Sequence, residues 1–194
     1  MRGRGTLVLL VLFAVVAGYA YLVERKRLPA EEREAKAKVI LALDPARISA
    51  VAFDYADSGV ALERRGAGWE LARLRPGAEA VRYAADESAV REVTAFFDEL
   101  RAERVMVEAD VDTAATGLAD PWVRVRVAMG DTEHTLAVGA QNPTRSAYYA
   151  RLDGGRAIAL LATWTVDSNL KRTVASLRDR RLARFDPEAA RRVE

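Results

Sequence analysis

The sequence predicts an α+β fold built on antiparallel sheet and preceded by an N-terminal transmembrane helix. Residues 6–23 form an uncharged, largely apolar run. Two later stretches alternate apolar and polar residues with a period of two, as half-buried strands do. Each stretch is followed by apolar residues spaced three and four apart, as on one face of a helix. Strands joined by short turns pair antiparallel, so the expected order is anchor, β-meander, helix, β-meander, helix.

The apolar run at residues 6–23 is long enough to cross a bilayer. As a helix it would span about 27 Å, close to the thickness of the hydrocarbon layer. Tyr19 and Tyr21 near its end suit the aromatic belt of a membrane interface. The alternative is a secretory signal peptide with residues 1–5 as its basic start and cleavage near Ala20. The sequence therefore predicts either a single-pass anchor in the inner (cytoplasmic) membrane or export followed by cleavage.

Charge around this run favours a cytoplasmic domain. Two arginines lie within residues 1–5, whereas six lysines and arginines lie within residues 24–38. The side richer in Lys and Arg usually faces the cytoplasm, and interleaved acids contribute little. Within the run, Ala14 and Gly18 form a small-xxx-small pair that could pack against a partner helix.

Composition narrows the class of protein. After the anchor and its stalk about 140 residues remain, which is one ordinary domain. The chain is 51% hydrophobic and 30% charged, which is typical of a globular protein. Its net charge of +2 is no signature of nucleic-acid binding. Because cysteine is absent, a disulfide, a thiolate metal site, a thiol nucleophile and a lipoprotein anchor are all excluded.

Breaks in the pattern define the segments. The chain divides into a basic start, an anchor, a helical stalk, an α+β domain and a tail, at residues 1–5, 6–23, 24–43, 44–182 and 183–194. Pro29 suits the first turn of a stalk helix that runs to Leu43, where Asp44-Pro45 would end it.

Periodicity places the elements of the domain. Strands are expected at residues 48–55, 60–64, from 69 onward, 105–107, 123–127, 132–138, 146–152 and 156–161. Asp86 is a suitable N-cap for a helix that ends near Arg104. The apolar face of this helix, which we expect to pack on the sheet through Val51 and Phe53, comprises Val90, Val93, Phe97 and Leu100. A closing helix capped by Thr163 would be lined by Val166, Leu170, Val174 and Leu177.

A short motif occurs twice. Leu43-Asp44-Pro45 and Phe185-Asp186-Pro187 each place an apolar residue before Asp-Pro and a valine six residues after the proline. The match is either coincidence or the start of a second repeat unit. On the repeat hypothesis, residues 183–194 should be extended with few contacts, and their deletion should change stability by less than about 0.5 kcal/mol.

The chain resembles the bacterial domain of unknown function 4340 family over nearly its whole length. The resemblance rests on the order of short motifs: Glu24-Arg25-Lys26-Arg27, Leu43-Asp44-Pro45, Gly68-Trp69-Glu70-Leu71, Arg101-Ala102-Glu103-Arg104-Val105, Gly117-Leu118-x-x-Pro121, Tyr148-Tyr149-Ala150-Arg151-Leu152-Asp153, Leu177-Arg178-Asp179-Arg180-Arg181-Leu182 and Phe185-Asp186-Pro187. It implies a single-pass membrane protein with its domain outside the cytoplasm, against the Lys/Arg count. It also implies association with ABC transporters of the gliding-motility type, and no known reaction.

Candidate catalytic residues are sparse. His134 is the only histidine, so it forms neither a triad nor a histidine metal cluster, and a structural role is expected. Glu108, Asp110 and Asp112 are spaced like oxygen ligands, but the calcium-loop glycine is missing. We therefore expect no metal and no cofactor, and a hydrolase using these three acids is the least favoured hypothesis.

The sequence offers one binding hypothesis for the domain. Arg124 and Arg126 share a face of one predicted strand, and Arg151 could join them across the sheet. An envelope glycan or lipid could bind there, although a solvated sheet face is the ordinary explanation. The leading hypothesis remains a non-enzymatic, membrane-anchored extracytoplasmic subunit of an ABC-transport complex, with membrane lipid and transporter subunits as its partners. The oligomeric state does not follow from the sequence.

Overall fold

The computed structural model describes residues 35–112 and 114–180. The chain divides into two units, Met1–Ala37 and Lys38–Glu194, and the second contains the folded domain. The predicted anchor with its Ala14–Gly18 pair, and the predicted tail at residues 183–194, lie outside the described residues. Among the residues that are described, no helix is long and apolar enough to cross a membrane.

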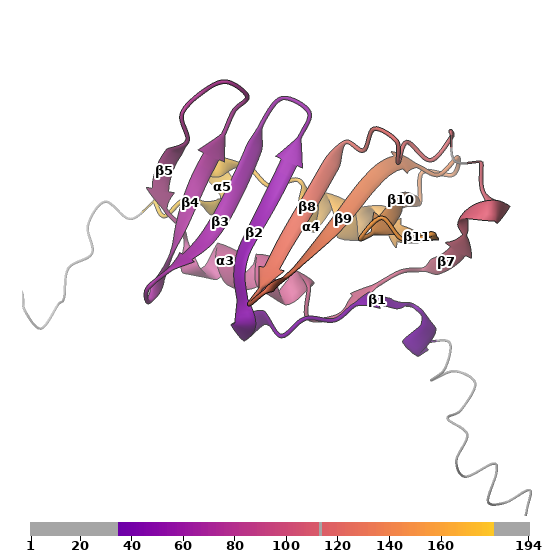
Figure 1. Cartoon of the computed structure of the whole chain (residues 1–194), viewed down its shortest axis with the longest axis horizontal. Coiled ribbons are helices and arrows are strands. Elements are labelled where there is room, and N and C mark those ends of the chain that lie inside the picture. The colour runs from indigo at the N-terminus through magenta and orange to yellow at the C-terminus, as the bar shows by residue number, and fades with distance from the viewer. Residues whose placement is uncertain (1–34, 113, 181–194) are drawn as a thin grey trace, which may run out of the picture. The chain divides into compact units, whose positions relative to one another are not determined.

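A single antiparallel sheet of nine strands forms the body of the domain (Figure 1). In spatial order its strands are β5 (Val81–Ala84), β4 (Gly68–Leu74), β3 (Gly59–Arg65), β2 (Ile48–Tyr55), β8 (Val123–Met129), β9 (Thr132–Gln141), β10 (Ala147–Leu152), β11 (Ala157–Ala162) and β7 (Arg104–Val107). A second, two-stranded sheet pairs β1 (Val39–Leu41) with β6 (Leu100–Arg101).

The two predicted meanders are joined edge to edge. β2 pairs antiparallel with β8 from Ile48↔Met129 to Tyr55↔Val123. On one side of this junction lie β3, β4 and β5 in chain order, and on the other lie β9, β10 and β11 in chain order, followed by β7 at the edge. The predicted α+β class with antiparallel sheet is confirmed for the described domain.

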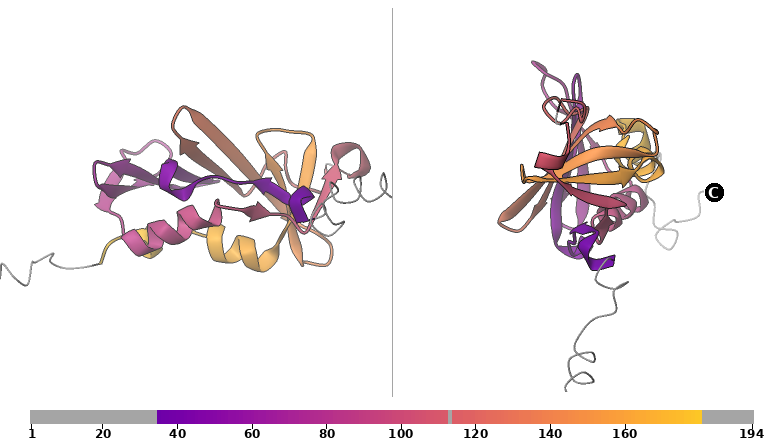
Figure 2. Two further views of the ribbon diagram at one scale, coloured as in Figure 1. Left: turned by 90° about the horizontal axis from the view of Figure 1, so that it is seen from below. Right: turned by 90° about the vertical axis from the view of Figure 1, so that its right-hand side faces the viewer.

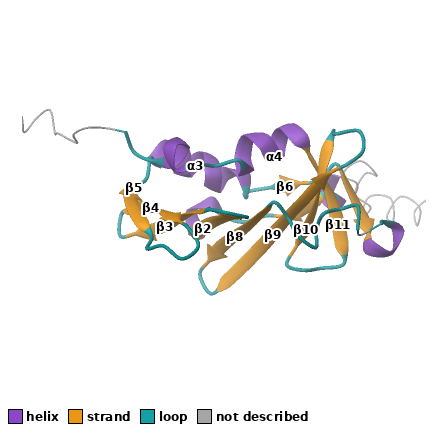
Figure 3. Ribbon diagram, turned by 90° about the horizontal axis from the view of Figure 1, so that it is seen from above, coloured by secondary structure: helices purple, strands orange, loops and turns teal. Residues whose placement is uncertain are grey.

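Three helices cover one face of the sheet (Figures 2 and 3). They are α3 (Glu87–Phe96), α4 (Thr163–Leu170) and α5 (Val174–Leu177), and two short 3₁₀ turns are η1 (Pro45–Arg47) and η2 (Glu108–Asp110). Asp86 is the N-cap of α3, as predicted, and its carboxylate accepts hydrogen bonds from the N–H groups of Ser88 and Ala89. Such a cap satisfies donors that have no partner within the helix.

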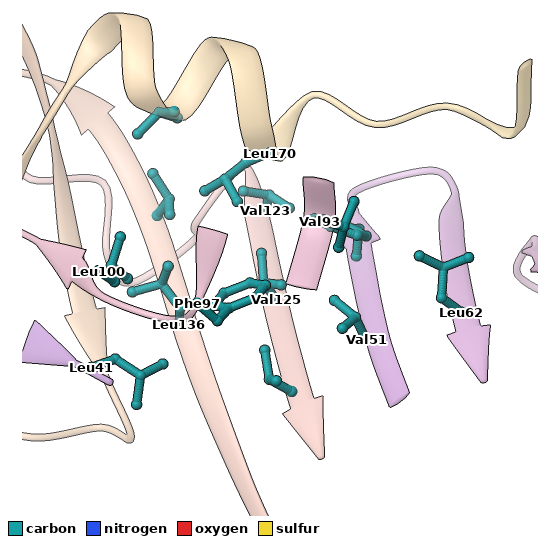
Figure 4. Packing of buried hydrophobic residues seen from close by; sticks show 14 of the residues in the cluster. Leu41, Val51, Leu62, Val93, Phe97, Leu100, Val123, Val125, Leu136 and Leu170 are labelled. Carbon is teal, nitrogen blue, oxygen red and sulfur yellow. The ribbon is translucent and has the colours of Figure 1, made fainter. Parts of the chain in front are cut away.

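The core lies between the helices and the sheet (Figure 4). Alternate residues of β8 point into it, and Val123, Val125 and Val127 are buried while Arg124 and Arg126 are exposed. The predicted helix residues Val90, Val93, Phe97 and Leu100 belong to the same buried cluster as Val51 and Phe53. The predicted packing of this segment on the sheet is therefore confirmed.

The prediction that the stalk helix extends to Leu43 is wrong. Residues 39–41 form β1 instead, which pairs with β6 and buries Leu41. The β-branched pair Val39-Ile40 favours a strand, and the partner strand makes one possible. Asp44 caps η1 rather than ending a helix, and β2 follows at once.

Helix α3 is also shorter than predicted. It ends at Phe96, with Phe97 as its C-cap, and Leu100 lies in β6 rather than on the helix. The three residues after Phe96 turn the chain so that Leu100 can pair opposite Leu41. Burial of Leu100 is therefore achieved from a strand, although its spacing also fits a helix.

The predicted closing helix is two helices, α4 and α5, separated by residues 171–173. Thr163 does not cap α4, because its hydroxyl donates to the carbonyl of Arg145 and the N-cap position is Ala162. Thr173 starts α5 with a capping box in which its side chain accepts from the N–H of Ser176. The break exposes backbone groups that Tyr55 satisfies, as described below.

Candidate functional site

A basic pocket opens on the helix-covered side of the sheet, beside the connection between α4 and α5. Its volume is about 620 Å³, within the range typical of small-ligand sites. The charged residues that line it are all cations, namely Arg73, Lys171, Arg172 and Arg178. Val60, Val174 and Ala175 contribute apolar surface. An apolar wall with several cations and no lining carboxylate is suited to an anion.

Register explains how Arg73 reaches this pocket. Arg73 pairs with Val60 across β3 and β4, and Val60 is buried on the helix side. Leu71, two residues earlier on the same face, is fully buried. Alternation therefore places an arginine where an apolar residue is usual. Because β4 ends at Leu74, the guanidinium lies at the margin of the core rather than inside it.

Tyr55 holds the residues that form the opposite wall. Its hydroxyl oxygen lies 2.6 Å from the carbonyl oxygen of Leu170 and 3.1 Å from that of Arg172, and it accepts the N–H of Arg172 at 2.9 Å. Burial raises the pKa of Tyr55, while the hydrogen bond and charge of Arg172 act in the opposite direction. The phenol is therefore neutral at physiological pH and fixes the break between α4 and α5.

The charges of two of the four cations are partly neutralised by nearby groups. Lys171 Nζ lies 2.8 Å from Asp167 Oδ1, and this contact raises the pKa of Lys171 and lowers that of Asp167. Arg172 Nε donates to the carbonyl of Asn169 at 3.0 Å, and its Nη1 is 3.8 Å from Glu92 Oε2.

The other two cations have no carboxylate partner among the described residues. Arg178 stacks on the ring of Tyr83, with 4.7 Å from its guanidinium carbon to the ring centroid. The side chain of Arg73 makes no hydrogen bond or ion pair within the described part of the chain. The pocket therefore carries positive charge that is not neutralised by these residues, and an anionic group would supply the missing partner.

The predicted arginine site lies on the opposite, open face of the sheet. Arg124 and Arg151 both pair with Ala137 of β9, so they flank it in one row. Arg126 lies on the same face but forms an ion pair with Asp54 at 3.0 Å. A small hollow of about 250 Å³ on this face is lined by Arg126 but not by the other two arginines. The strands thus place the three arginines on one face, and ligand binding there stays a prediction.

Arg151 is engaged by one of the predicted acids. Its Nη2 lies 2.6 Å from Glu108 Oε1, while its buried Nε has no partner among the described atoms. Asp112 accepts the N–H of Ala114, which is an ordinary turn contact. The side chain of Asp110 lies outside what the structure describes. In the described residues no group of three or more metal-binding side chains comes together.

His134 has a local partner. Its Nδ1 lies 2.7 Å from Asp153 Oδ2, and the same carboxylate accepts the N–H of Thr135 through Oδ1. These contacts tie β9 to the turn after β10. They agree with the structural role expected for this histidine.

The sequence predictions do not include the basic pocket, although the position of Arg73 is one signal for it. Arg73 falls at even spacing from Trp69 and Leu71, so alternation alone assigns it to the helix-facing side. The position of Arg73 in one pocket with residues 171–178 does not follow from the sequence, because the apolar spacing there predicts one continuous helix. Only the break in that helix turns Lys171 and Arg172 toward β3 and β4.

The fold and pocket define an antiparallel α+β domain with a cationic pocket beside its helices. The family model described as "Domain of unknown function (DUF4340)" matches residues 77–194. The chain belongs to this family, as its motifs indicated. No match was found among curated proteins or among solved structures.

Proposed function

We propose that this chain is a non-enzymatic module, anchored in the inner membrane with its domain outside the cytoplasm, that binds an anionic ligand in the basic pocket. The observation that carries the proposal is the set of four cations in a pocket of about 620 Å³ without a lining carboxylate. Cations and a hydrogen-bonded phenol hold an anion but offer no general base at neutral pH. Binding therefore fits this site better than catalysis.

The side chains that line the basic pocket indicate the chemistry of its ligand. Arg73 and Arg178 supply planar donors that match phosphate or carboxylate oxygens, and Val60 and Val174 offer apolar contact. A phosphate or carboxylate attached to a partly apolar body satisfies both. This proposal keeps the class of ligand expected from the sequence, an envelope glycan or lipid, but moves its site from the open face to the pocket.

Titration calorimetry on the full-length protein in detergent tests the proposal. The probes are pyrophosphate, citrate and short-chain phosphatidic acid, which separate free phosphate, carboxylate and lipid headgroup. Arg73→Ala and Arg178→Ala should each weaken binding about tenfold or more, since a charge-assisted hydrogen bond contributes about 1.5–3 kcal/mol. The matched control is Arg124→Ala, an exposed arginine of the open face.

Two outcomes would contradict the proposal that an anion binds in the basic pocket. If none of the three probes binds, the cations serve another purpose. If Arg124→Ala abolishes binding while Arg73→Ala does not, the open-face arginines form the site.

We further propose that the module assembles with an ABC-transport complex. Support comes from the family resemblance alone. Affinity purification of the tagged full-length protein from detergent-solubilised membranes should enrich ATPase and permease subunits of such a transporter. An unrelated single-pass protein carrying the same tag is the control. Equal recovery with both baits would remove this part of the proposal.

A further inference from the structure

One end of the described domain exposes a strip of apolar side chains. Four large hydrophobic residues of the described chain are exposed, and three of them are Val105, Val107 and Trp164, at 40%, 60% and 73%. We call these three residues the edge strip. Val105 and Val107 belong to β7, the last strand of the sheet, and Trp164 is the second residue of α4.

The edge strip lies on one side of the sheet. Val105 pairs with Ala159 and Val107 with Ala157 across β11. Ala159 belongs to the core cluster, so these positions point to the helix-covered face. Helix α4 packs on β11 and β10 of that face, and Trp164 stands at its start. An exposed edge strand with two valines is a surface that proteins normally cover or charge.

The chain from the N-terminal segment enters the domain beside this strip. The carbonyl of Lys38 accepts the N–H of Ala102 at 2.7 Å, just before β1. Ala102 and Trp164 line the same cavity of about 780 Å³. β7 begins two residues after Ala102, and β1 pairs with β6, the short strand that precedes β7 in the chain. Lys38, where the chain enters the folded domain, and Trp164 therefore both lie near the start of β7.

The tether is short. Fourteen residues, 24–37, separate the apolar run from Lys38. Even fully extended they reach at most about 50 Å, and as a helix about 21 Å. An anchor at residues 6–23 would therefore keep Lys38, the point at which the chain enters the domain, within about 50 Å of the membrane.

We propose that the edge strip rests on the outer surface of the membrane, with Trp164 in the interfacial layer. The inference rests on the proposed membrane anchorage and adds an orientation to it. Tryptophan and aliphatic side chains partition into this layer through their apolar area. The cavity beside Trp164 carries both acids and bases, namely Glu92, Glu99, Glu103, Arg101 and Arg172. The contact is therefore apolar and does not depend on anionic lipid.

This orientation also determines where the basic pocket lies. The pocket adjoins β3 and β4, which are six and seven strands from β7 in the sheet order. At about 4.8 Å per strand that is about 29–34 Å along the sheet. The pocket would then be held away from the bilayer, and its ligand would enter from the aqueous phase.

Brominated phosphatidylcholine tests the inference, because bromine quenches tryptophan fluorescence on contact. The full-length protein is reconstituted into vesicles with and without this lipid, at low and high salt. Quenching should be seen at both salt concentrations and should be lost in Trp164→Phe. It should persist in Trp69→Phe, a matched control on β4. Val107→Glu should weaken the quenching while the protein stays anchored, as judged by resistance to alkaline carbonate.

The outcomes separate the orientation from the anchorage. If the protein resists carbonate extraction but Trp164→Phe leaves the quenching unchanged, the edge strip does not face the bilayer and the inference is overturned. A protein that carbonate releases is not anchored, and the proposed anchorage and the inference fall together.

Discussion

Single side chains hold the basic pocket in shape, and Tyr55 does so through its hydroxyl. Its ring stacks near Trp122, at 6.1 Å between centroids, and Trp122 in turn lies 5.8 Å from Tyr148. Tyr148 donates to Asp167 at 3.1 Å. Two tyrosines on either side of a tryptophan thus tie the sheet to α4 and to the residues that follow it.

We expect Tyr55→Phe to lower the free energy of unfolding by about 1–3 kcal/mol, because the Arg172 N–H and the Leu170 carbonyl lose their partner. Urea unfolding at pH 7 measures the change. Tyr149→Phe is the control, since the hydroxyl of Tyr149 has no hydrogen bond among the described residues. Equal midpoints for the two variants would contradict the role given to Tyr55.

Alkaline pH should narrow the difference between wild type and Tyr55→Phe. The pKa of Tyr55 is raised in the fold, so the neutral phenol is the form that the fold favours. The corresponding stability is fully present below about pH 10, the ordinary tyrosine pKa, and is lost as the pH rises through the raised value. Tyr148 shifts in the same direction and remains in both proteins. Unfolding midpoints compared at pH 7 and above pH 10 measure the effect, and a constant difference would contradict it.

Gly139 allows a loop to lie directly on the open face of the sheet. A Cβ at this position would stand 2.2 Å from the carbonyl oxygen of Thr116 and 2.8 Å from the carbonyl carbon of Gly117. The neighbouring N–H of Ala140 donates to the same Thr116 oxygen at 2.7 Å. The loop is backbone at this contact, so it cannot move aside as a flexible side chain could.

Gly139→Ala should destabilise the domain by about 1–3 kcal/mol, as overpacking usually does. Gly68→Ala is the control, because a Cβ there meets nothing within 4 Å. Thermal unfolding of both variants gives the comparison. A Gly139→Ala protein as stable as the control would mean that the loop is free to lift from β9.

At the scale of elements, α3 packs on the first meander and contributes to the core. Phe97, its C-cap, is fully buried, and its ring meets that of Phe96 edge-on at 4.9 Å. The carbonyl of Phe97 also accepts the N–H of Leu43 at 2.9 Å. The end of α3 therefore joins the helix, the small β1–β6 sheet and the start of β2.

Phe97→Ala should lower the free energy of unfolding by about 3–5 kcal/mol, as large core truncations do. Phe96→Ala removes the same ring from a partly buried position and should have a smaller effect. Chemical unfolding of the two variants distinguishes them. An unchanged midpoint for Phe97→Ala would show that α3 is not part of the core.

At the scale of the whole molecule, the proposed membrane anchorage requires a choice of the side on which the domain lies. The Lys/Arg count favours the cytoplasm, whereas the family resemblance places the domain outside. We expect protease added to intact spheroplasts to remove the domain. A cytoplasmic protein that stays intact in the same sample is the control. A protected domain would mean that the charge count is right and that the proposed localisation is wrong.

The sequence alone determined the local elements of this protein. Period-two alternation located most strands, including β2, β8 and β9, because one face of each strand is buried and the other is wet. Asp86 identified the start of α3, since an N-cap acts through its own neighbouring N–H groups. The motifs identified the family. These signals are local, and each can be interpreted within a few residues of where it acts.

The tertiary structure alone decided which distant segments meet. The β2–β8 pairing joins two meanders into one sheet, and the sequence of neither strand indicates that the other is its partner. β1 is a strand only because β6 lies beside it, and the closing helix breaks where the Tyr55 hydroxyl donates to the carbonyl of Leu170. The basic pocket unites Tyr55 and Arg73 with residues 171–178, so it depends on that break. Long-range pairing is set by burial summed over the whole domain, which a local pattern does not contain.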